Sequence, residues 1–150
     1  MADIAAFPSI SIPLNNAGNV YNFVASGAIV PGQVVCFADA GASGTVLASI
    51  AGAGTKPIGV AVSKAASGAY VAVALNGSVV TVANADDTAT IDAGHQVICN
   101  DNAVKGTVSE VLAVGTSTVP QDVVGILIED MDAGSTAKML VQIFDTTKHA

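Results

Sequence analysis

Gly59-Val60-Ala61-Val62, followed by a small-residue segment, Gly68 and the apolar run 69–75, is the stretch that decides the fold. It recurs 66 positions later, where Gly125-Ile126-Leu127-Ile128 leads to Gly134 and the run 135–141. Both Gly-to-Gly intervals span nine positions (68 − 59 and 134 − 125). Two upstream pieces recur in the same order: Gln33-Val34-Val35-Cys36 with Gln96-Val97-Ile98-Cys99, and Gly44-Thr45-Val46 with Gly106-Thr107-Val108. A duplicated β-unit without duplicated chemistry indicates a structural role.

Composition favours strands over helices. The chain is 51% hydrophobic but only 4% aromatic and 11% charged, so it has little material for helices with a solvated face. Val and Thr favour pleated strands, and the glycines mark turns. We therefore expect an all-β protein, a small barrel or sandwich. The expected strands are 20–24, 33–37, 45–50, 58–62, 69–75, 78–83, 96–99, 107–114, 123–128 and 137–144.

One local signal predicts a hairpin. Asn76-Gly77 lies between two alternating apolar runs and is a preferred type I′ turn pair, so it should join 70–75 to 78–83. The expected structural turn residues are Gly59, Gly68, Asn76, Gly77, Gly125 and Gly134.

The domain organisation follows from length and from the repeat. We expect an extended N-terminal arm over 1–18 and one β domain over 19–150, with pseudo-repeats at about 29–83 and 92–144. In the arm, Pro8 and Pro13 bound an alternating apolar stretch. It is an edge strand of its own domain, an arm that binds a partner, or a disordered segment. In the second case the interface residues are Phe7, Pro8, Ile10, Ile12, Pro13 and Leu14.

The charge excludes several partners. With net charge −7, five Lys and no Arg, the chain lacks a surface for nucleic acid or for an anionic membrane. No apolar run reaches 18 residues, and the N-terminus has no signal-peptide pattern, so we expect no membrane association. We expect the protein to stay in the cytoplasm, where it is made.

Candidate catalytic and metal-binding residues do not assemble into a set. Ser63-Lys64 are strand neighbours that point to opposite faces, and the second repeat has Glu129-Asp130 there. Cys36 and Cys99 occupy matching strand positions as buried apolar residues; a mutual contact, or a metal site with His95, is the alternative. The carboxylates of Asp86-Asp87 and of Glu129, Asp130 and Asp132 lack EF-hand spacing, and solvated turns are favoured over a cation site. Gly52–Lys56 lacks Walker spacing. We predict no catalytic residue, no cofactor site and no metal site.

Three pieces resemble the capsid cement, or head decoration, proteins of tailed phages and prophages. These pieces are Pro31–Cys36, Lys56–Ala61 and Ala65–Gly68, and the resemblance covers about 20–144, more loosely in the second half. It implies a β-barrel or β-tulip-like fold and a virion structural protein on the capsid exterior. It also implies binding to the major capsid protein, self-association as a homotrimer, and stabilisation of the shell by bridging capsid subunits.

Two other classes stay open. A receptor- or carbohydrate-binding module on a virion spike or fibre would expose aromatic side chains. A small β-barrel hydrolase would depend on Cys36, Cys99, His95 or Ser63.

Overall fold

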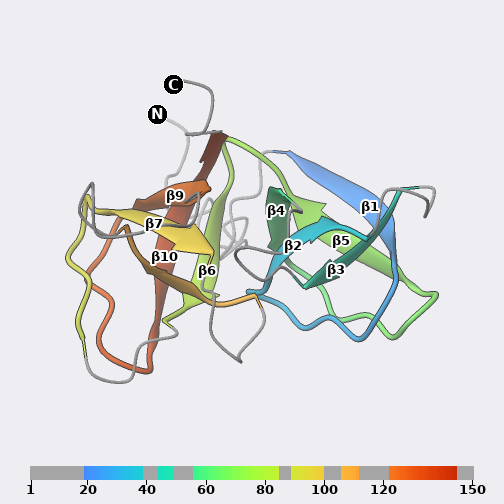
Figure 1. The fold of residues 1–150 in the computed structure, drawn as a ribbon, viewed down its shortest axis with the longest axis horizontal. Helices are drawn as coiled ribbons and strands as arrows, with labels where there is room; N and C mark the ends of the chain where they lie inside the picture. Colours follow the sequence, from blue (N-terminus) through green and yellow to red (C-terminus); the bar gives the residue numbers. More distant parts are fainter. Residues whose placement is uncertain are drawn as a thin grey trace, which may run out of the picture.

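The computed structural model describes residues 19–38, 44–48, 56–84, 89–99, 106–111 and 122–144. Over these residues the chain forms ten strands and no helix, which confirms the predicted all-β class. Figure 1 shows two lobes side by side, one built by β1 to β5 and the other by β6 to β10.

The first lobe is a closed five-stranded barrel in the order β1-β3-β2-β4-β5, with β5 pairing back to β1. The pairing of β1 with β3 is parallel, and the other four pairings are antiparallel. Closure removes the outer edges of an open sheet, where other chains could pair. Its strands are β1 (Val20–Ala25), β2 (Val34–Phe37), β3 (Thr45–Ala48), β4 (Pro57–Ala61) and β5 (Tyr70–Ala74).

The second lobe repeats this plan in the order β6-β10-β9-β7-β8. A parallel bridge between Asn84 and Val108 links its outer strands, as the parallel β1–β3 pairing does in the first lobe. The cyclic strand order is therefore the same in both lobes, although the first is a closed barrel and the second is a five-stranded sheet joined at its outer strands, within the described part of the chain, by that bridge alone. We call the two lobes the first and second barrel. The strands are β6 (Val79–Ala83), β7 (Gln96–Cys99), β8 (Val108–Glu110), β9 (Val123–Leu127) and β10 (Thr136–Phe144).

Strand register gives the residue-by-residue correspondence of the barrels. Val35 pairs with Gly59, and Val97 pairs with Gly125, so β2 matches β7 at an offset of 62 (97 − 35) and β4 matches β9 at 66 (125 − 59). Val24 pairs with Tyr70, and Ala83 pairs with Thr136, which follows Tyr70 by the same offset of 66 (136 − 70). Strand β1 therefore matches β6 at an offset of 59 (83 − 24). The units therefore span about 19–75 and 78–144. The predicted bounds of 29–83 and 92–144 differ because they place β6 in the first unit, although it is the counterpart of β1.

The hairpin predicted at Asn76-Gly77 does not form. The turn itself is present: Gly77 has φ 89°, and the Ser78 N–H donates to the Leu75 carbonyl at 3.2 Å. However, β5 already pairs with β1 and β4, while β6 pairs with β10. Because barrel closure uses both edges of β5, the turn sends the chain into the second barrel instead.

The repeated glycines have two different roles. A Cβ at Gly59 would lie 2.3 Å from the Ala74 carbonyl oxygen, and one at Gly125 would lie 2.3 Å from that of Leu140. Both residues lie inside strands, so the prediction that they are turn residues is wrong: they permit close approach of neighbouring strands. Gly68 and Gly134 do lie in turns, with φ of 81° and 63°.

The described residues form two hydrophobic clusters. One is confined to the first barrel and is built around small and β-branched side chains such as Val35, Val46 and Val71. The other fills the second barrel and also includes Val34, Val60 and Ala74 of the first. The Val34 N–H also donates to the Gly106 carbonyl at 2.8 Å. The outer face of the first barrel is thus packed against the second.

Candidate binding surface

A hydrogen-bond network holds the junction where the chain passes between barrels. The Asn76 side chain pairs with the backbone of β10 in both directions: its Oδ1 accepts from the Ile143 N–H at 2.9 Å, and its Nδ2 donates to the Ile143 carbonyl at 3.4 Å. The Asn19 Nδ2 donates to the Asn76 carbonyl at 3.0 Å. The fully buried Ser78 Oγ lies 3.3 Å from both the N–H and the carbonyl of Asn19. These contacts connect β1, the junction and β10.

An open groove of about 530 Å³ lies over this network. Its volume is within the range of ligand-binding clefts. None of its lining side chains is a carboxylate, amine, imidazole or thiol, so the groove offers apolar contact, the side-chain amides of two asparagines and the hydroxyl of Tyr21. It is lined by Asn19, Val20, Tyr21, Ile58, Leu75, Asn76 and Ile143.

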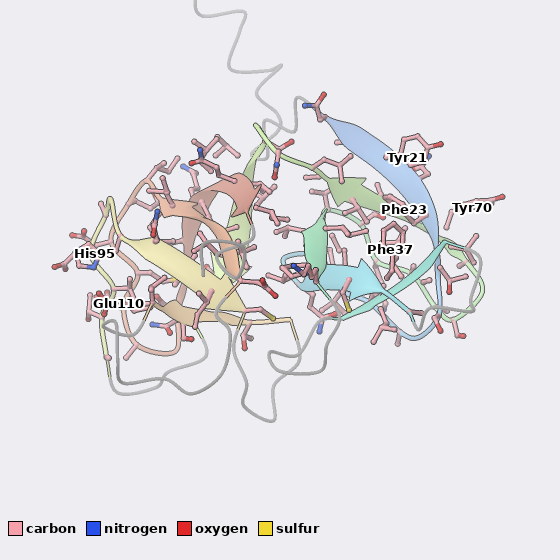
Figure 2. The ribbon with its side chains drawn as sticks, turned by 45° about the horizontal axis from the view of Figure 1, so that its top comes forward. Tyr21, Phe23, Phe37, Tyr70, His95 and Glu110 are labelled. Atoms are coloured by element: carbon pink, nitrogen blue, oxygen red, sulfur yellow. The ribbon has the colours of Figure 1, made fainter. Side chains whose placement is uncertain are left out.

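Three aromatic rings continue the apolar surface from this groove. The rings of Tyr21 and Phe23 have centroids 5.2 Å apart, and those of Phe23 and Phe37 are 5.9 Å apart in an edge-to-face arrangement. Phe23 packs against the first-barrel core, whereas Tyr21 and Phe37 are 63% and 46% exposed. Figure 2 shows the three rings together on the first barrel, with Tyr70 projecting away from them. We call Tyr21, Phe23, Phe37, Ile58 and Leu75 together the apolar face.

The apolar face was not found from the sequence. The usable signal was the spacing of Tyr21 and Phe23, which places both rings on one side of a strand. The approach of Phe37 depends on closure of the barrel, which no local pattern shows.

Ser63, weighed above as a candidate nucleophile, is bonded to the backbone. Its Oγ accepts from the Ala72 N–H at 2.9 Å. At the equivalent position, Glu129 Oε1 accepts from the Lys138 N–H at 2.8 Å. The two side chains satisfy the same strand amide in each barrel, so the repeat conserves this contact although the residue type differs.

The carboxylates around Glu129 act as local acceptors. Asp130 Oδ1 accepts from the Ala93 N–H at 2.8 Å, and Asp132 Oδ1 lies 3.5 Å from the Thr90 hydroxyl. Within the described ranges no group of three or more His, Cys, Asp or Glu side chains is placed to hold a metal ion. Asp86 and Asp87 lie outside those ranges.

The two cysteines are buried, as predicted, and neither is in a disulfide. They are not equivalent, however. Cys36 pairs with Leu47 while Ile98 pairs with Ser109, so Cys36 matches Ile98 and Phe37 matches Cys99. The matching letters of the two Gln-Val-(Val/Ile)-Cys segments are displaced by one residue from the true register.

His95 is paired with a carboxylate and not with Cys99. Its Nδ1 lies 2.6 Å from Glu110 Oε1, and both side chains are about half exposed. Figure 2 places this pair on the second barrel, at the opposite end of the molecule from the aromatic rings. An exposed pair of this kind contributes little to stability.

The predicted arm lies outside the described residues, including Phe7, Pro8, Ile10, Ile12, Pro13 and Leu14, as does most of Gly52–Lys56. The part of the chain that is described contains no helix long and apolar enough to cross a membrane.

Comparison with known proteins gives a match among the solved structures. No protein-family model matches the chain, and no curated protein matches it. The crystal structure of the N base of head fiber gp8.5 from bacteriophage phi29 matches with a TM-score of 0.56 and 14% identity. The match covers 83% of this chain and 93% of that chain, more than either barrel could supply, so the shared fold includes both barrels. The matched protein is a phage head fiber, and at this identity the likeness is one of fold.

Proposed function

We propose that this protein is a virion structural protein of a tailed phage, located on the outside of the head. The observation that carries the proposal is the two-barrel fold shared with the base of a phage head fiber. The chemistry of the described residues supports it: the candidate nucleophile Ser63 and the carboxylates of Glu129 and Asp130 bond backbone amides, and the thiols are buried. No catalytic step or cofactor is part of the proposal.

In this function the protein binds the major capsid protein and bridges neighbouring subunits, which stabilises the shell. Two barrels that share a hydrophobic cluster and a hydrogen-bonded junction form one unit suited to that task. Self-association as a homotrimer would multiply modest contacts on an icosahedral surface. The N-terminal arm, with its apolar residues Phe7, Ile10, Ile12 and Leu14, is the segment we expect to bind the capsid or a neighbouring copy.

The test uses heads assembled from the major capsid protein of the same virus, mixed with the purified protein. We expect saturable binding to the exterior, visible by electron microscopy, and a higher temperature of head disruption. A variant lacking residues 1–14 should keep the circular dichroism spectrum of the full chain but lose binding. Absence of binding by the full chain would overturn the proposal, and normal binding by the truncated variant would overturn the role of the arm.

A second candidate function is a receptor- or carbohydrate-binding module on a fibre. Two observations favour it: the matched protein is a head fiber, and Tyr21, Phe37 and Tyr70 are exposed, as in many sugar-binding sites. A glycan-binding screen distinguishes the two. Specific binding to one glycan class, lost in Tyr70→Ser or Tyr21→Ser, would support this candidate.

A further inference from the structure

The internal repeat shows what covers the equivalent of the apolar face in the second barrel. The offsets of 59, 62 and 66 assign a counterpart to each of its five residues. Every counterpart is at most 3% exposed, whereas the members of the apolar face are half-buried or exposed. The counterparts of Tyr21, Phe23, Phe37, Ile58 and Leu75 are Val80, Val82, Cys99, Val124 and Val141.

The hydrophobic cluster that contains these counterparts also includes three residues from the outer face of the first barrel. Val34 pairs with Val60, and Val60 with Ala74, so the three form a row across β2, β4 and β5. All three belong to the hydrophobic cluster of the second barrel. The neighbouring backbone is also close: a Cβ at Gly32 would lie 3.1 Å from the Thr81 carbonyl oxygen. The row of one barrel thus packs on the face of the next barrel along the chain.

The second barrel carries the same row on its own outer face. Gln96 pairs with Ile126, and Ile126 with Leu140, so these residues are the counterparts of Val34, Val60 and Ala74. Ile126 and Leu140 are half-buried, and Gln96 is exposed. We call these three residues the outer row. Among the described residues, the apolar face of the first barrel and the outer row of the second barrel therefore each lack the cover that the two barrels give each other.

Charge favours contact between unlike barrels. Residues 19–75 contain one carboxylate and two lysines, whereas residues 78–144 contain nine carboxylates and two lysines. Second barrels of two copies would repel each other, but a second barrel beside a first barrel would not.

We propose that copies of this chain associate head to tail, with the outer row of one copy packed on the apolar face of the next. The contact repeats the packing of the two barrels within one chain. Tyr21 and Phe37 are the central residues, since large aromatic side chains dominate such interfaces. A head-to-tail contact makes a ring when its rotation closes, such as the homotrimer expected above. The inference rests on the self-association in the proposed function and names its surface.

Sedimentation of the full-length chain and three variants tests this contact. Tyr21→Ser/Phe37→Ser alters the apolar face, Gln96→Glu places a charge in the outer row, and Tyr70→Ser is the matched control, because Tyr70 is 75% exposed on the first barrel but outside the face. We expect the wild type and Tyr70→Ser to associate equally. The two interface variants should associate at least about tenfold more weakly while keeping the circular dichroism spectrum of the folded chain.

Mixing the two interface variants gives the decisive readout. Each retains one intact surface, so a head-to-tail contact predicts heterodimers in the mixture at concentrations where each variant alone is monomeric. If the faces instead paired with each other, Gln96→Glu would associate like the wild type, and the inference would fail. A wild type that stays monomeric at all concentrations would also overturn it.

A fluorescent variant tests the same contact through a signal that changes when copies associate. The chain has no Trp, so Phe37→Trp supplies a single reporter on the apolar face. Its emission should shift to shorter wavelength as concentration rises, and an unshifted spectrum in the associated state would contradict the contact. Binding to the particle is measured separately. A wild type that binds the particle as a monomer would support the proposed function and reject the head-to-tail contact. A wild type that associates head to tail but does not bind the particle would support the contact and reject the proposed function.

Discussion

At the scale of single residues, Gly59 and Gly125 fix how closely two strands of each barrel approach. The space a Cβ would occupy is taken by a carbonyl oxygen and by the side chain of Val73 or Met139. Replacement by Ala therefore requires backbone movement, which is more costly than adjustment of a flexible side chain.

We expect Gly59→Ala and Gly125→Ala each to lower the free energy of unfolding by about 1–3 kcal/mol or more. Gly27→Ala is the control, because a Cβ there meets nothing within 4 Å. Urea unfolding followed by circular dichroism measures all three. Equal stability of Gly59→Ala and Gly27→Ala would show that the strands can separate without cost.

The equivalent acceptors Ser63 and Glu129 give a second prediction. Ser63→Ala and Glu129→Ala each leave a strand amide without its side-chain acceptor and should cost about 1 kcal/mol. Glu129→Gln keeps an acceptor oxygen and should be close to wild type. Hydrogen exchange of the Ala72 and Lys138 amides reports the loss directly, and equal exchange in Glu129→Ala and Glu129→Gln would argue against the role assigned to the carboxylate.

At the scale of elements, the Asn76 side chain acts as a short extension of the sheet along β10. Its two hydrogen bonds to Ile143 resemble those that a strand residue would make. The junction therefore restrains the far end of β10 as well as turning the chain.

Asn76→Ala should lower stability by about 1 kcal/mol and speed hydrogen exchange at Ile143. Gln142→Ala is the matched control, because Gln142 is exposed and occupies the equivalent position in the second unit at the offset of 66. Similar exchange at Ile143 in both variants would remove the special role of Asn76.

The same scale shows how far the sequence predicts this structure. The β4–β5 and β9–β10 units were predicted correctly, because glycine placement and alternation are local signals. The prediction of a hairpin at Asn76-Gly77 is wrong, because a turn sequence does not determine which strands pair with each other. The cysteine match was displaced by one residue because hydrogen-bond register, not letter identity, sets equivalence. The apolar face was missed because β1 and β2 meet only when the barrel closes.

For the whole molecule, the cluster shared between barrels predicts joint unfolding. Val34, Val60 and Ala74 would be exposed if the second barrel unfolded alone. Each barrel carries one buried thiol, Cys36 in the first and Cys99 in the second. Thiol labelling in mild denaturant, with Cys99→Ala or Cys36→Ala leaving one reporter at a time, should give opening free energies that agree within about 1 kcal/mol. A difference of several kcal/mol would mean that the barrels open independently.

The unequal offsets between the units also mark where the chain accepts extra residues. From β1 to β2 the second unit is longer by three (62 − 59), and from β3 to β4 it is longer by four (66 − 62). The β2–β3 and β4–β5 connections keep their lengths, because each pair of strands shares one offset with its counterpart. Comparison of the two units therefore shows which connections tolerate added residues. Foreign peptides inserted between β3 and β4, over residues 49–55, should leave the barrel folded. Peptides inserted between β4 and β5 should disrupt it.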